Sequence, residues 1–457
     1  MVAKHCQGTR RLLNTLGLFS TVFITLLALP AISNAGALEN YVNQPDTSYN
    51  WKRTEQTKID KATVTHLELV SQTWRGQFWS HHLQIVRPIQ VRNPGIALIF
   101  ITGDGDGARD IEMLNLLAQR AGTITAVLTK VPNQPLYDGR KEDSLIAYTL
   151  DQYLKTGDET WPLLFPMVKS AIRGMDAVQA LAEKEFNQKI EKFVVTGASK
   201  RGWTTWLAAA VDPRVKAIAP MVIDMLNMKA QLQWAEKCYG KQSEQISDYT
   251  DLNLHRQLDD PPMQKLRSWI DPYSYRDRYT MPKLLLLGTN DPYWVVDSLR
   301  HYWNDLPEPK LVFQTPNAGH NLGGAKDATQ TLAAWFQMIA DGQELPRVEW
   351  KLYAGSLADS KLYAYAKGPA SISAHVSSRA NKARLWTAHS DNRDFRNAKW
   401  TSEDHPELKP EAVGLATEVL VPEKGFTAFM GEFELTSPTG DTYKLSTQVQ
   451  VTPDNVK

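Results

Sequence analysis

The sequence predicts an α/β domain with a mostly parallel sheet, followed by an antiparallel β-sandwich. From about residue 41 to residue 345, short apolar runs alternate with longer runs of helical periodicity, as in strands linked by covering helices. After residue 346 the runs become shorter and alternate apolar with polar residues, the period of half-buried strands. The chain of 457 residues is also too long for one ordinary core, so two domains are expected.

The first domain is expected to span residues 36–345. Its strands are predicted where apolar and β-branched residues form short runs: 83–91, 95–102, 123–130, 193–196, 215–223, 283–288 and 310–315. Its clearest helices are predicted at 111–120, 161–186 and 329–342. Because ligands of parallel sheets bind at the carboxyl ends of the strands, functional residues are expected in the loops that follow these strands.

Residues 229–279 interrupt this alternation. The segment is polar and rich in Asp, Gln and Tyr, and it carries the pairs Pro261-Pro262 and Asp271-Pro272. Since it lies between two core strands, we expect a mostly helical cap over the carboxyl edge of the sheet, with an ordinary long connection as the alternative.

The second domain, residues 346–457, is predicted to be the β-sandwich. Its strands are expected at 348–353, 361–367, 371–377, 383–388, 416–421, 425–435 and 442–451. No group of catalytic residues is evident in it. We therefore expect it to contribute stability or substrate placement.

The N-terminus has the composition of an export signal. A basic segment at residues 4–11 precedes an apolar run over 16–32, which ends at Ser33-Asn34-Ala35, a small-x-small cleavage signal. The run is short for a membrane span and is interrupted by Pro30, so a cleaved signal peptide (residues 1–35) is favoured over an uncleaved anchor. The predicted location is the bacterial periplasm or the exterior of the cell.

Composition argues against several classes of function. A formal charge of +1 and the lack of any Lys/Arg-rich run give no reason to expect a nucleic-acid partner. No Gly-x4-Gly-Lys-Ser/Thr phosphate loop occurs. Cys238 is the only cysteine beyond the signal, so the mature protein is expected to have neither an internal disulfide nor a thiolate zinc site. No metal and no cofactor are expected.

The most informative motif surrounds Ser199. The run Phe193-Val194-Val195-Thr196 ends in Gly197-Ala198-Ser199-Lys200-Arg201-Gly202, and helical periodicity follows. In a nucleophile elbow, such a tight strand–turn–helix connection exposes the serine hydroxyl and directs a helix N-terminus at a developing oxyanion. The usual motif has a small residue two places after the serine. Here Arg201 occupies that place and Gly202 follows one residue later, so the assignment depends on partner residues.

A serine nucleophile needs a histidine to accept its proton and a carboxylate to orient that histidine. In the hydrolase plan both partners follow the serine in the chain, each after a later strand. Asp291 and His320 stand directly after two predicted core strands. Ser199, Asp291 and His320 are therefore the predicted catalytic triad. Asp224, which follows another core strand, is the alternative acid.

Two backbone donors are predicted for the oxyanion hole. One is the N–H of Lys200, directly after the nucleophile. The second is expected from Gly103 or Asp104, in the glycine-rich loop 102–107 that follows an early strand.

Substrate-binding residues are predicted around the elbow. Lys200 and Arg201 place two positive charges there, and Arg201 is a candidate for binding an anionic substrate group. The alternative is that Lys200 points to solvent and Arg201 pairs with a carboxylate such as Asp224 or Asp176. Aromatic residues close to the elbow and to the acid are candidate pocket walls: Trp203, Trp206, Tyr293 and Trp294, of which Trp203 and Trp206 are alternatively core residues.

Four segments resemble the PhoPQ-activated pathogenicity-related protein family: residues 195–206, 212–215, 219–227 and 288–293. The resemblance extends from residue 38 to about residue 451. It implies the α/β-hydrolase fold, since the family is assigned to that superfamily and consists mostly of exported bacterial proteins with a C-terminal β domain. A eukaryotic relative suggests a serine-peptidase-like activity. The Gly-x-Ser-Lys/Arg-x-Gly elbow is also similar to that of glucuronoyl esterases.

The predicted function is therefore an exported serine hydrolase that cleaves an ester or amide bond through an acyl-enzyme. The substrate is expected to be a small molecule or a peptide, and esterase and peptidase activities both stay open. The alternative is a catalytically silent, hydrolase-like binding protein of the bacterial envelope. No stable membrane span is expected after signal cleavage, and the pattern contains no signal for an oligomeric state.

Overall fold

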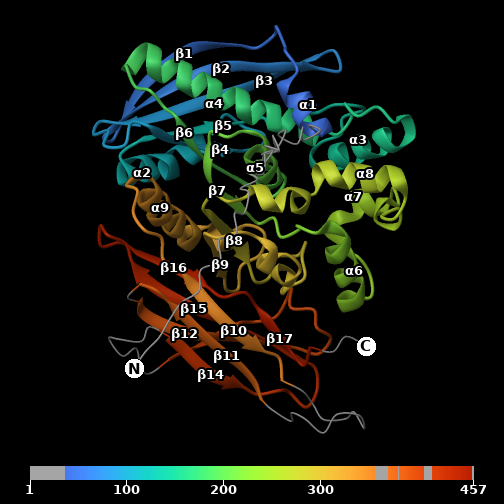
Figure 1. The fold of residues 1–457 in the computed structure, drawn as a ribbon. Helices are drawn as coiled ribbons and strands as arrows, with labels where there is room; N and C mark the ends of the chain where they lie inside the picture. Colours follow the sequence, from blue (N-terminus) through green and yellow to red (C-terminus); the bar gives the residue numbers. More distant parts are fainter. Residues whose placement is uncertain (1–35, 356–368, 379, 406–413, 455–457) are drawn as a thin grey trace, which may run out of the picture. The chain divides into compact units, whose positions relative to one another are not determined.

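The fold is described from a computed structural model, which covers residues 36–355, 369–378, 380–405 and 414–454 (Figure 1). The predicted export signal and the strand expected at 361–367 lie outside the described residues.

A nine-stranded sheet runs through the first part of the chain, in the order β1-β2-β3-β5-β4-β6-β7-β8-β9 (Figure 1). From β5 to β9 neighbouring strands are parallel, as predicted, whereas β1, β2 and β3 form an antiparallel edge, and β3 pairs antiparallel with β5. The strands are β1 (Asn50–Ile59), β2 (Ala62–Trp74), β3 (Gln77–Pro88), β4 (Ile96–Ile101), β5 (Ile124–Leu128), β6 (Lys192–Ala198), β7 (Val215–Met221), β8 (Lys283–Gly288) and β9 (Lys310–Thr315).

Helices cover both faces of this sheet, and each face has its own core. Along β4, Ala97, Ile99 and Ile101 belong to the core beneath α4 and α5, whereas Ile96 and Leu98 belong to the core beneath α2 and α9. Strands buried on both faces explain the continuous apolar runs in the sequence. The α-helices are α1 (Ala37–Asn43), α2 (Ile111–Ala121), α3 (Glu142–Thr156), α4 (Leu164–Phe186), α5 (Lys200–Val211), α6 (Met228–Tyr239), α7 (Ser247–Thr250), α8 (Pro261–Ile270) and α9 (Lys326–Ala340).

The segment predicted as a cap connects β7 to β8 and is mostly helical. It contains α6, α7 and α8 together with the 3-10 helices η2 (Glu244–Ile246), η3 (Leu254–Arg256) and η4 (Pro272–Arg278). Four further 3-10 helices lie in other connections: η1 (Ala108–Asp110), η5 (Ser298–His301), η6 (Trp303–Asp305) and η7 (Leu322–Gly324).

The C-terminal part forms two antiparallel sheets, ordered β10-β11-β14 and β13-β12-β15-β16, with β17 paired to β15. Their apolar faces share a core in which Ile372 and Leu415 of one sheet join Phe433 of the other. The predicted strand 442–451 is two strands, and β13 was not predicted. The strands are β10 (Val348–Tyr353), β11 (Ala370–Val376), β12 (Ala380–Ser390), β13 (Thr401–Asp404), β14 (Gly414–Val419), β15 (Phe426–Thr436), β16 (Thr442–Ser446) and β17 (Gln450–Thr452).

The C-terminal sheets pack directly against the α/β part. Ser446 Oγ accepts a hydrogen bond of 2.9 Å from the backbone N–H of Gln314 on β9, and Lys444 forms an ion pair of 2.6 Å with Asp327 on α9. The described residues from 36 to 454 accordingly form one compact unit.

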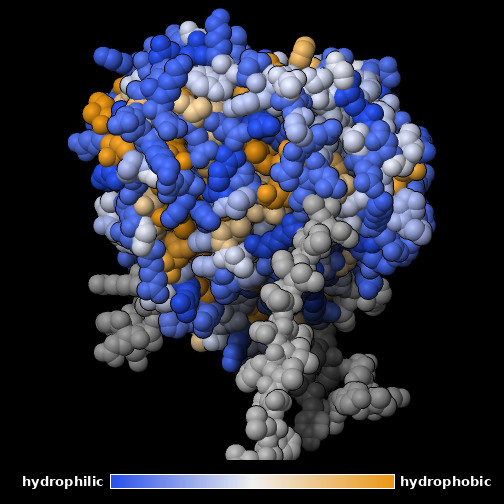
Figure 2. Space-filling model, turned by 45° about the horizontal axis from the view of Figure 1, so that its top comes forward, coloured by the Kyte–Doolittle hydropathy of each residue, from blue (hydrophilic) through white to orange (hydrophobic). Residues whose placement is uncertain are grey.

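The face in Figure 2 is predominantly polar, with hydrophobic patches separated by hydrophilic side chains. Among the described residues, no helix combines the length and the apolar character needed to cross a membrane.

Candidate active site

Ser199 lies at the sharp turn between β6 and α5. Its backbone has φ 57° and ψ −125°, a conformation that residues with a side chain rarely adopt. Holding it costs on the order of 1–3 kcal/mol. Its N–H donates a hydrogen bond of 2.9 Å to the carbonyl oxygen of Met221 on β7, which holds the turn against the next strand. The serine is partly exposed. This is the strained strand–turn–helix geometry that the sequence motif predicts.

Gly202 provides the close packing that the elbow requires. A Cβ at this position would lie 2.7 Å from Ile223 Cγ2 and 3.0 Å from the carbonyl oxygen of Met221. Helix α5 can therefore approach β7 only because residue 202 has no side chain. The position two places after the serine, where Arg201 stands, does not carry this constraint.

Asp291 and His320 are joined by a hydrogen bond. His320 Nδ1 lies 2.8 Å from Asp291 Oδ2, and the other carboxylate oxygen accepts a bond of 3.0 Å from the N–H of Tyr293. Asp291 is buried, whereas the His320 side chain is 27% exposed. The Tyr293 ring packs against the imidazole with a centroid separation of 4.3 Å. This pairing leaves Nε2 as the nitrogen of His320 that can accept a proton.

The sheet brings the three predicted residues to one edge. Ser199 follows β6, Asp291 follows β8 and His320 follows β9, and these strands are parallel. Tyr293, which contacts His320, lines the same cavity as Ser199. Ser199 Oγ makes no hydrogen bond within the described part of the chain, to His320 or to any other residue. Serine–histidine bonds are often loose before substrate binds.

Asp224, the alternative acid, has a different partner. Its Oδ1 accepts a hydrogen bond of 2.6 Å from the hydroxyl of Tyr302. Complete burial, together with the nearby charges of Asp291 and Asp297, raises the pKa of this carboxyl to about 7. Of the two candidate carboxylates, it is Asp291 that is hydrogen-bonded to His320.

The two cations that follow Ser199 are bound to protein carboxylates. Both side chains are nearly buried: Arg201 donates two hydrogen bonds of 2.7 Å to the two oxygens of Glu142, and Lys200 lies 3.0 Å from Glu142 and from Asp143. Burial alone would raise the pKa of Glu142, but the hydrogen bonds and charges of Arg201 and Lys200 prevail and lower it to about 2.

This arrangement corrects two expectations from the sequence. Lys200 does not point to solvent, and the carboxylate that pairs with Arg201 is Glu142, not Asp224 or Asp176. Because a bidentate bond to Glu142 occupies the guanidinium, Arg201 is not free to bind an anionic substrate group in this structure.

The loop predicted to supply the second oxyanion donor lies beside the elbow. In the parallel pair β4–β6, Ile101 is opposite Gly197, so Gly103 and Ser199 leave the sheet at equivalent positions. The Arg201 guanidinium packs over Gly103, so a Cβ at this position would require the guanidinium to move. The loop lines a polar cleft with Arg201 and Glu142, and the side chain of Asp104 contacts Gln134 at 3.1 Å.

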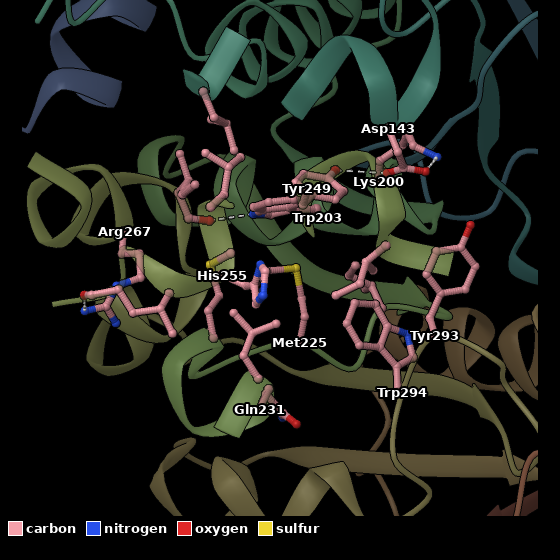
Figure 3. Close-up of a pocket in the computed structure, with 18 of the residues that line it drawn as sticks. Asp143, Lys200, Trp203, Met225, Gln231, Tyr249, His255, Arg267, Tyr293 and Trp294 are labelled. Carbon is pink, nitrogen blue, oxygen red and sulfur yellow. Dashed lines mark hydrogen bonds and ion pairs between the residues drawn. The ribbon is translucent and has the colours of Figure 1, made fainter. Parts of the chain in front are cut away.

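A cavity opens beside Ser199 beneath the cap (Figure 3). Three of the predicted wall residues line it, namely Trp203, Tyr293 and Trp294, whereas Trp206 is fully buried in the core. Trp203 is nearly buried too, and its indole N–H donates to the carbonyl oxygen of Ile270 on α8.

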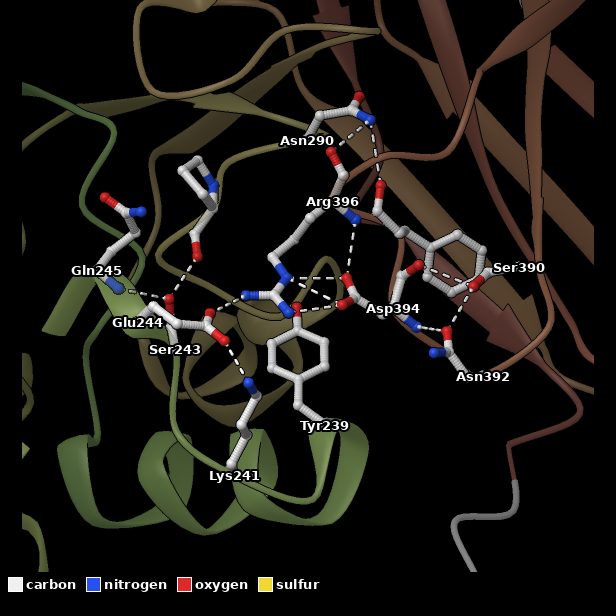
Figure 4. A network of polar contacts seen from close by, with 12 residues as sticks. Tyr239, Lys241, Ser243, Glu244, Gln245, Asn290, Ser390, Asn392, Asp394 and Arg396 are labelled. Atoms are coloured by element: carbon white, nitrogen blue, oxygen red, sulfur yellow. Dashed lines mark hydrogen bonds and ion pairs between the residues drawn. The ribbon is translucent and has the colours of Figure 1, made fainter. Parts of the chain in front are cut away.

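Several residues of the site carried no sequence signal that identified them. Glu142 and Asp143 begin α3, far from the elbow in sequence, and an acidic helix start is an ordinary feature. Asn290, which precedes Asp291, was not predicted as a site residue. Its amide nitrogen donates to the backbone oxygens of Phe395 and Arg396 (Figure 4). It also donates to that of Ala398.

No group of three or more His, Cys, Asp or Glu side chains that could hold a metal ion occurs among the described residues. Cys238 is buried and free.

The strand order and the turn at Ser199, followed by the hydrogen-bonded Asp291 and His320, define a protein of the α/β-hydrolase fold. The chain belongs to the PhoPQ-activated pathogenicity-related protein family, whose model matches residues 38–396 and bears out the resemblance seen in the sequence. It is 31% identical over 473 residues to autocrine proliferation repressor protein A of Dictyostelium discoideum, which covers 95% of this chain and 94% of that protein.

Solved structures with a similar fold include two acetyl xylan esterases. The enzyme from Paenibacillus sp. R4 is 15% identical, covers 65% of this chain and 91% of its own, and has a TM-score of 0.48. Acetyl xylan esterase 1 from Thermoanaerobacterium sp. is 17% identical, covers 66% of this chain and 92% of its own, and has a TM-score of 0.46.

Proposed function

We propose that the protein is a serine hydrolase that cleaves an ester or amide bond, with Ser199 as nucleophile, His320 as general base and Asp291 as the acid that orients the histidine. The observation that carries this proposal is the strained backbone of Ser199. Such strain persists only where the surrounding structure maintains it, and it is typical of functional positions. The Asp291–His320 hydrogen bond at the same edge of the sheet supplies the remaining groups.

The reaction would follow the acyl-enzyme route. His320 Nε2 accepts the hydroxyl proton as Ser199 Oγ attacks the carbonyl carbon, and Asp291 stabilises the imidazolium through Nδ1. His320 then donates the proton to the leaving group. Water, activated by the same imidazole, attacks the acyl-enzyme and releases the acid. No cofactor enters this scheme.

The oxyanion of the tetrahedral intermediate would face the start of α5. The first N–H groups of a helix have no intrahelical partner, so the N–H of Lys200 is available as a donor, and the helix dipole favours negative charge there. We assign the second donor to Gly103 or Asp104, from the position of their loop next to the elbow. With Lys200 and Arg201 paired to Glu142 and Asp143, stabilisation would depend on backbone donors.

We also propose that the protein is exported to the periplasm or to the exterior of the cell. The support is the sequence of residues 1–35, a basic segment followed by an apolar run and a small-x-small site. Determining the N-terminal residue of the protein secreted by its host would test this, and an N-terminus at Met1 in the cytoplasmic fraction would contradict it.

The proposed chemistry is tested by active-site labelling. Purified protein is treated with a small fluorophosphonate, which reacts covalently with an activated serine, in parallel with the Ser199→Ala variant. We expect labelling that depends on Ser199 and disappears in the variant. If folded wild-type protein is not labelled, the proposal fails and a catalytically silent binding protein becomes the better description.

A further inference from the structure

The cavity next to Ser199 is predominantly apolar. It lies between α5, the end of β7 and the cap, and its interior measures about 120 Å³. At roughly 10–15 Å³ for each water molecule, this is space for about ten waters. Aliphatic and thioether side chains from both the core and the cap form half of its lining residues, including Leu150, Ile223, Met225, Leu232, Ile246 and Met263.

Some polar groups in this wall are paired within the protein, whereas His255 Nδ1, Arg267 Nε and Trp294 Nε1 are buried without a hydrogen-bond partner among the described residues. Asp143 accepts a hydrogen bond of 3.0 Å from the Tyr249 hydroxyl and lies 3.0 Å from Lys200 Nζ. The Gln231 amide donates to two backbone carbonyl oxygens at 3.1 Å, and Arg267 donates to one at 3.0 Å. In Figure 3, Arg267 lies on the opposite side of the cavity from Lys200 and Tyr293, with the apolar wall between them. A ligand between these ends meets mainly hydrocarbon and aromatic surface.

The position of His320 decides which part of a substrate would occupy the cavity. The leaving group must come within hydrogen-bonding reach of the imidazole, which protonates it. His320 is not among the described residues that line the cavity. It lies against the ring of Tyr293, which does line it. The leaving group therefore belongs on the His320 side of Ser199, and the cavity is left for the acyl group.

We infer that the protein acts on substrates with a bulky apolar acyl group, of medium-chain length or an apolar aminoacyl residue. This inference rests on the proposed function, since it assumes acylation of Ser199. Burial of each methylene group contributes about 0.8 kcal/mol, which corresponds to about fourfold in binding. An acetyl group would leave most of the cavity unfilled.

The inference is tested with p-nitrophenyl esters from acetyl to decanoyl, which share one leaving group. We expect kcat/KM to rise at least about tenfold from acetyl to octanoyl. A maximum at acetyl, or a flat profile, would overturn it. A parallel series of aminoacyl p-nitroanilides, with alanyl, leucyl and phenylalanyl groups, distinguishes the source of the acyl group. Preference for the larger residues would identify peptides, and preference for the octanoyl ester a fatty acyl substrate.

A pair of variants on α6 tests whether the preference for long acyl groups arises in this cavity. Leu232 lines the cavity and Gln233, its exposed neighbour, does not, so Leu232→Trp fills the cavity while Gln233→Trp adds the same bulk outside it. We expect Leu232→Trp to lower the octanoyl-to-acetyl ratio of kcat/KM by about tenfold and Gln233→Trp to leave it unchanged. Equal ratios in all three proteins would overturn the inference.

Binding to the Ser199→Ala protein separates this inference from the proposed function. That variant keeps the cavity without the nucleophile, and calorimetry is expected to detect decanoate but not acetate, with decanoate binding weakened by Leu232→Trp. Failure of fluorophosphonate labelling would refute the serine chemistry alone. Failure of decanoate to bind more tightly than acetate would refute the apolar acyl site, whatever the chemistry.

Discussion

His320 Nδ1 lies 2.8 Å from Asp291 Oδ2. The two residues lie on the loops that follow the neighbouring strands β9 and β8. This bond fixes the orientation and the tautomer of the imidazole, and in the proposed mechanism Nε2 is then the nitrogen that accepts the Ser199 proton. Replacing Asp291 by Asn keeps the shape of the side chain but removes its charge and can present an N–H to the ring.

We therefore expect Asp291→Asn to lower kcat by about 10³- to 10⁴-fold on any substrate that the wild type cleaves. The measurement is initial-rate kinetics, with thermal unfolding as the check on folding. Asp224→Asn is the matched control, because Asp224 bonds to Tyr302 and not to His320. If Asp224→Asn proved the more damaging to kcat, the assignment of the acid would be reversed.

Gly202 is expected to tolerate no side chain. Gly202→Ala places a methyl group 2.7 Å from Ile223 Cγ2, so α5 must shift away from β7, and we expect a loss of about 1–3 kcal/mol in the free energy of unfolding. Gly95→Ala is the control, because a Cβ at Gly95 would have no neighbour within 4 Å. Urea denaturation of both variants gives the comparison. Equal stability of the two variants would show that the elbow does not depend on Gly202.

The buried Asp224 should make stability depend on pH. Burial, followed by repulsion from Asp291 and Asp297, raises the pKa of this carboxyl from 3.8 to about 7. Between these values the folded protein binds the proton more tightly than the unfolded chain, so this contribution to stability is complete below pH 4 and is lost as the pH rises through 7.

Asp224→Asn has no proton to lose and can still accept the Tyr302 hydrogen bond. We expect its free energy of unfolding, relative to wild type, to increase by on the order of 2 kcal/mol between pH 5 and pH 8. Urea titrations at the two pH values measure the change. Parallel pH profiles for both proteins would mean that Asp224 is ionised in the folded state throughout.

Local sequence patterns were sufficient to predict the parallel sheet and the elbow. The four leucines 284–287 form a continuous apolar run because both faces of the strand are buried, and the structure has β8 at Lys283–Gly288. The edge strand β1 was missed because it is largely exposed and polar, so its sequence lacks a clear alternation of apolar and polar residues. Strand β13 is four residues long and fully exposed, which leaves no apolar pattern either.

The interactions between distant segments could not be predicted in the same way. The sequence showed two positive charges after Ser199 but not the carboxylates that neutralise them. Glu142 and Asp143 reach Lys200 only because α3 packs next to the elbow. A charge in a motif therefore says little about a substrate until its partners in the fold are known.

Contacts between distant segments also connect the C-terminal part to the candidate site. Asn290 precedes Asp291, and its amide nitrogen donates to the carbonyl oxygens of Phe395, Arg396 and Ala398, at 3.1, 3.3 and 2.7 Å. The first two bonds are drawn in Figure 4. Arg396 is held in turn by ion pairs with Asp394 at 2.6 Å and with Glu244 of the cap at 3.1 Å. The loop that carries the acid is thus attached to the C-terminal part of the chain.

Asn290→Ala should lower activity more than its effect on stability explains. Removing the amide leaves the three carbonyl oxygens without this donor, so the Asp291 loop can move. Small displacements of catalytic groups cost up to about a hundredfold in rate. We expect kcat to fall roughly ten- to a hundredfold at a temperature where the variant is fully folded. Asn381→Ala, which removes an exposed hydrogen bond to Thr436 in the C-terminal part, serves as the control. A variant at Asn290 with a lower melting temperature but wild-type kcat would limit the C-terminal part to a stabilising role.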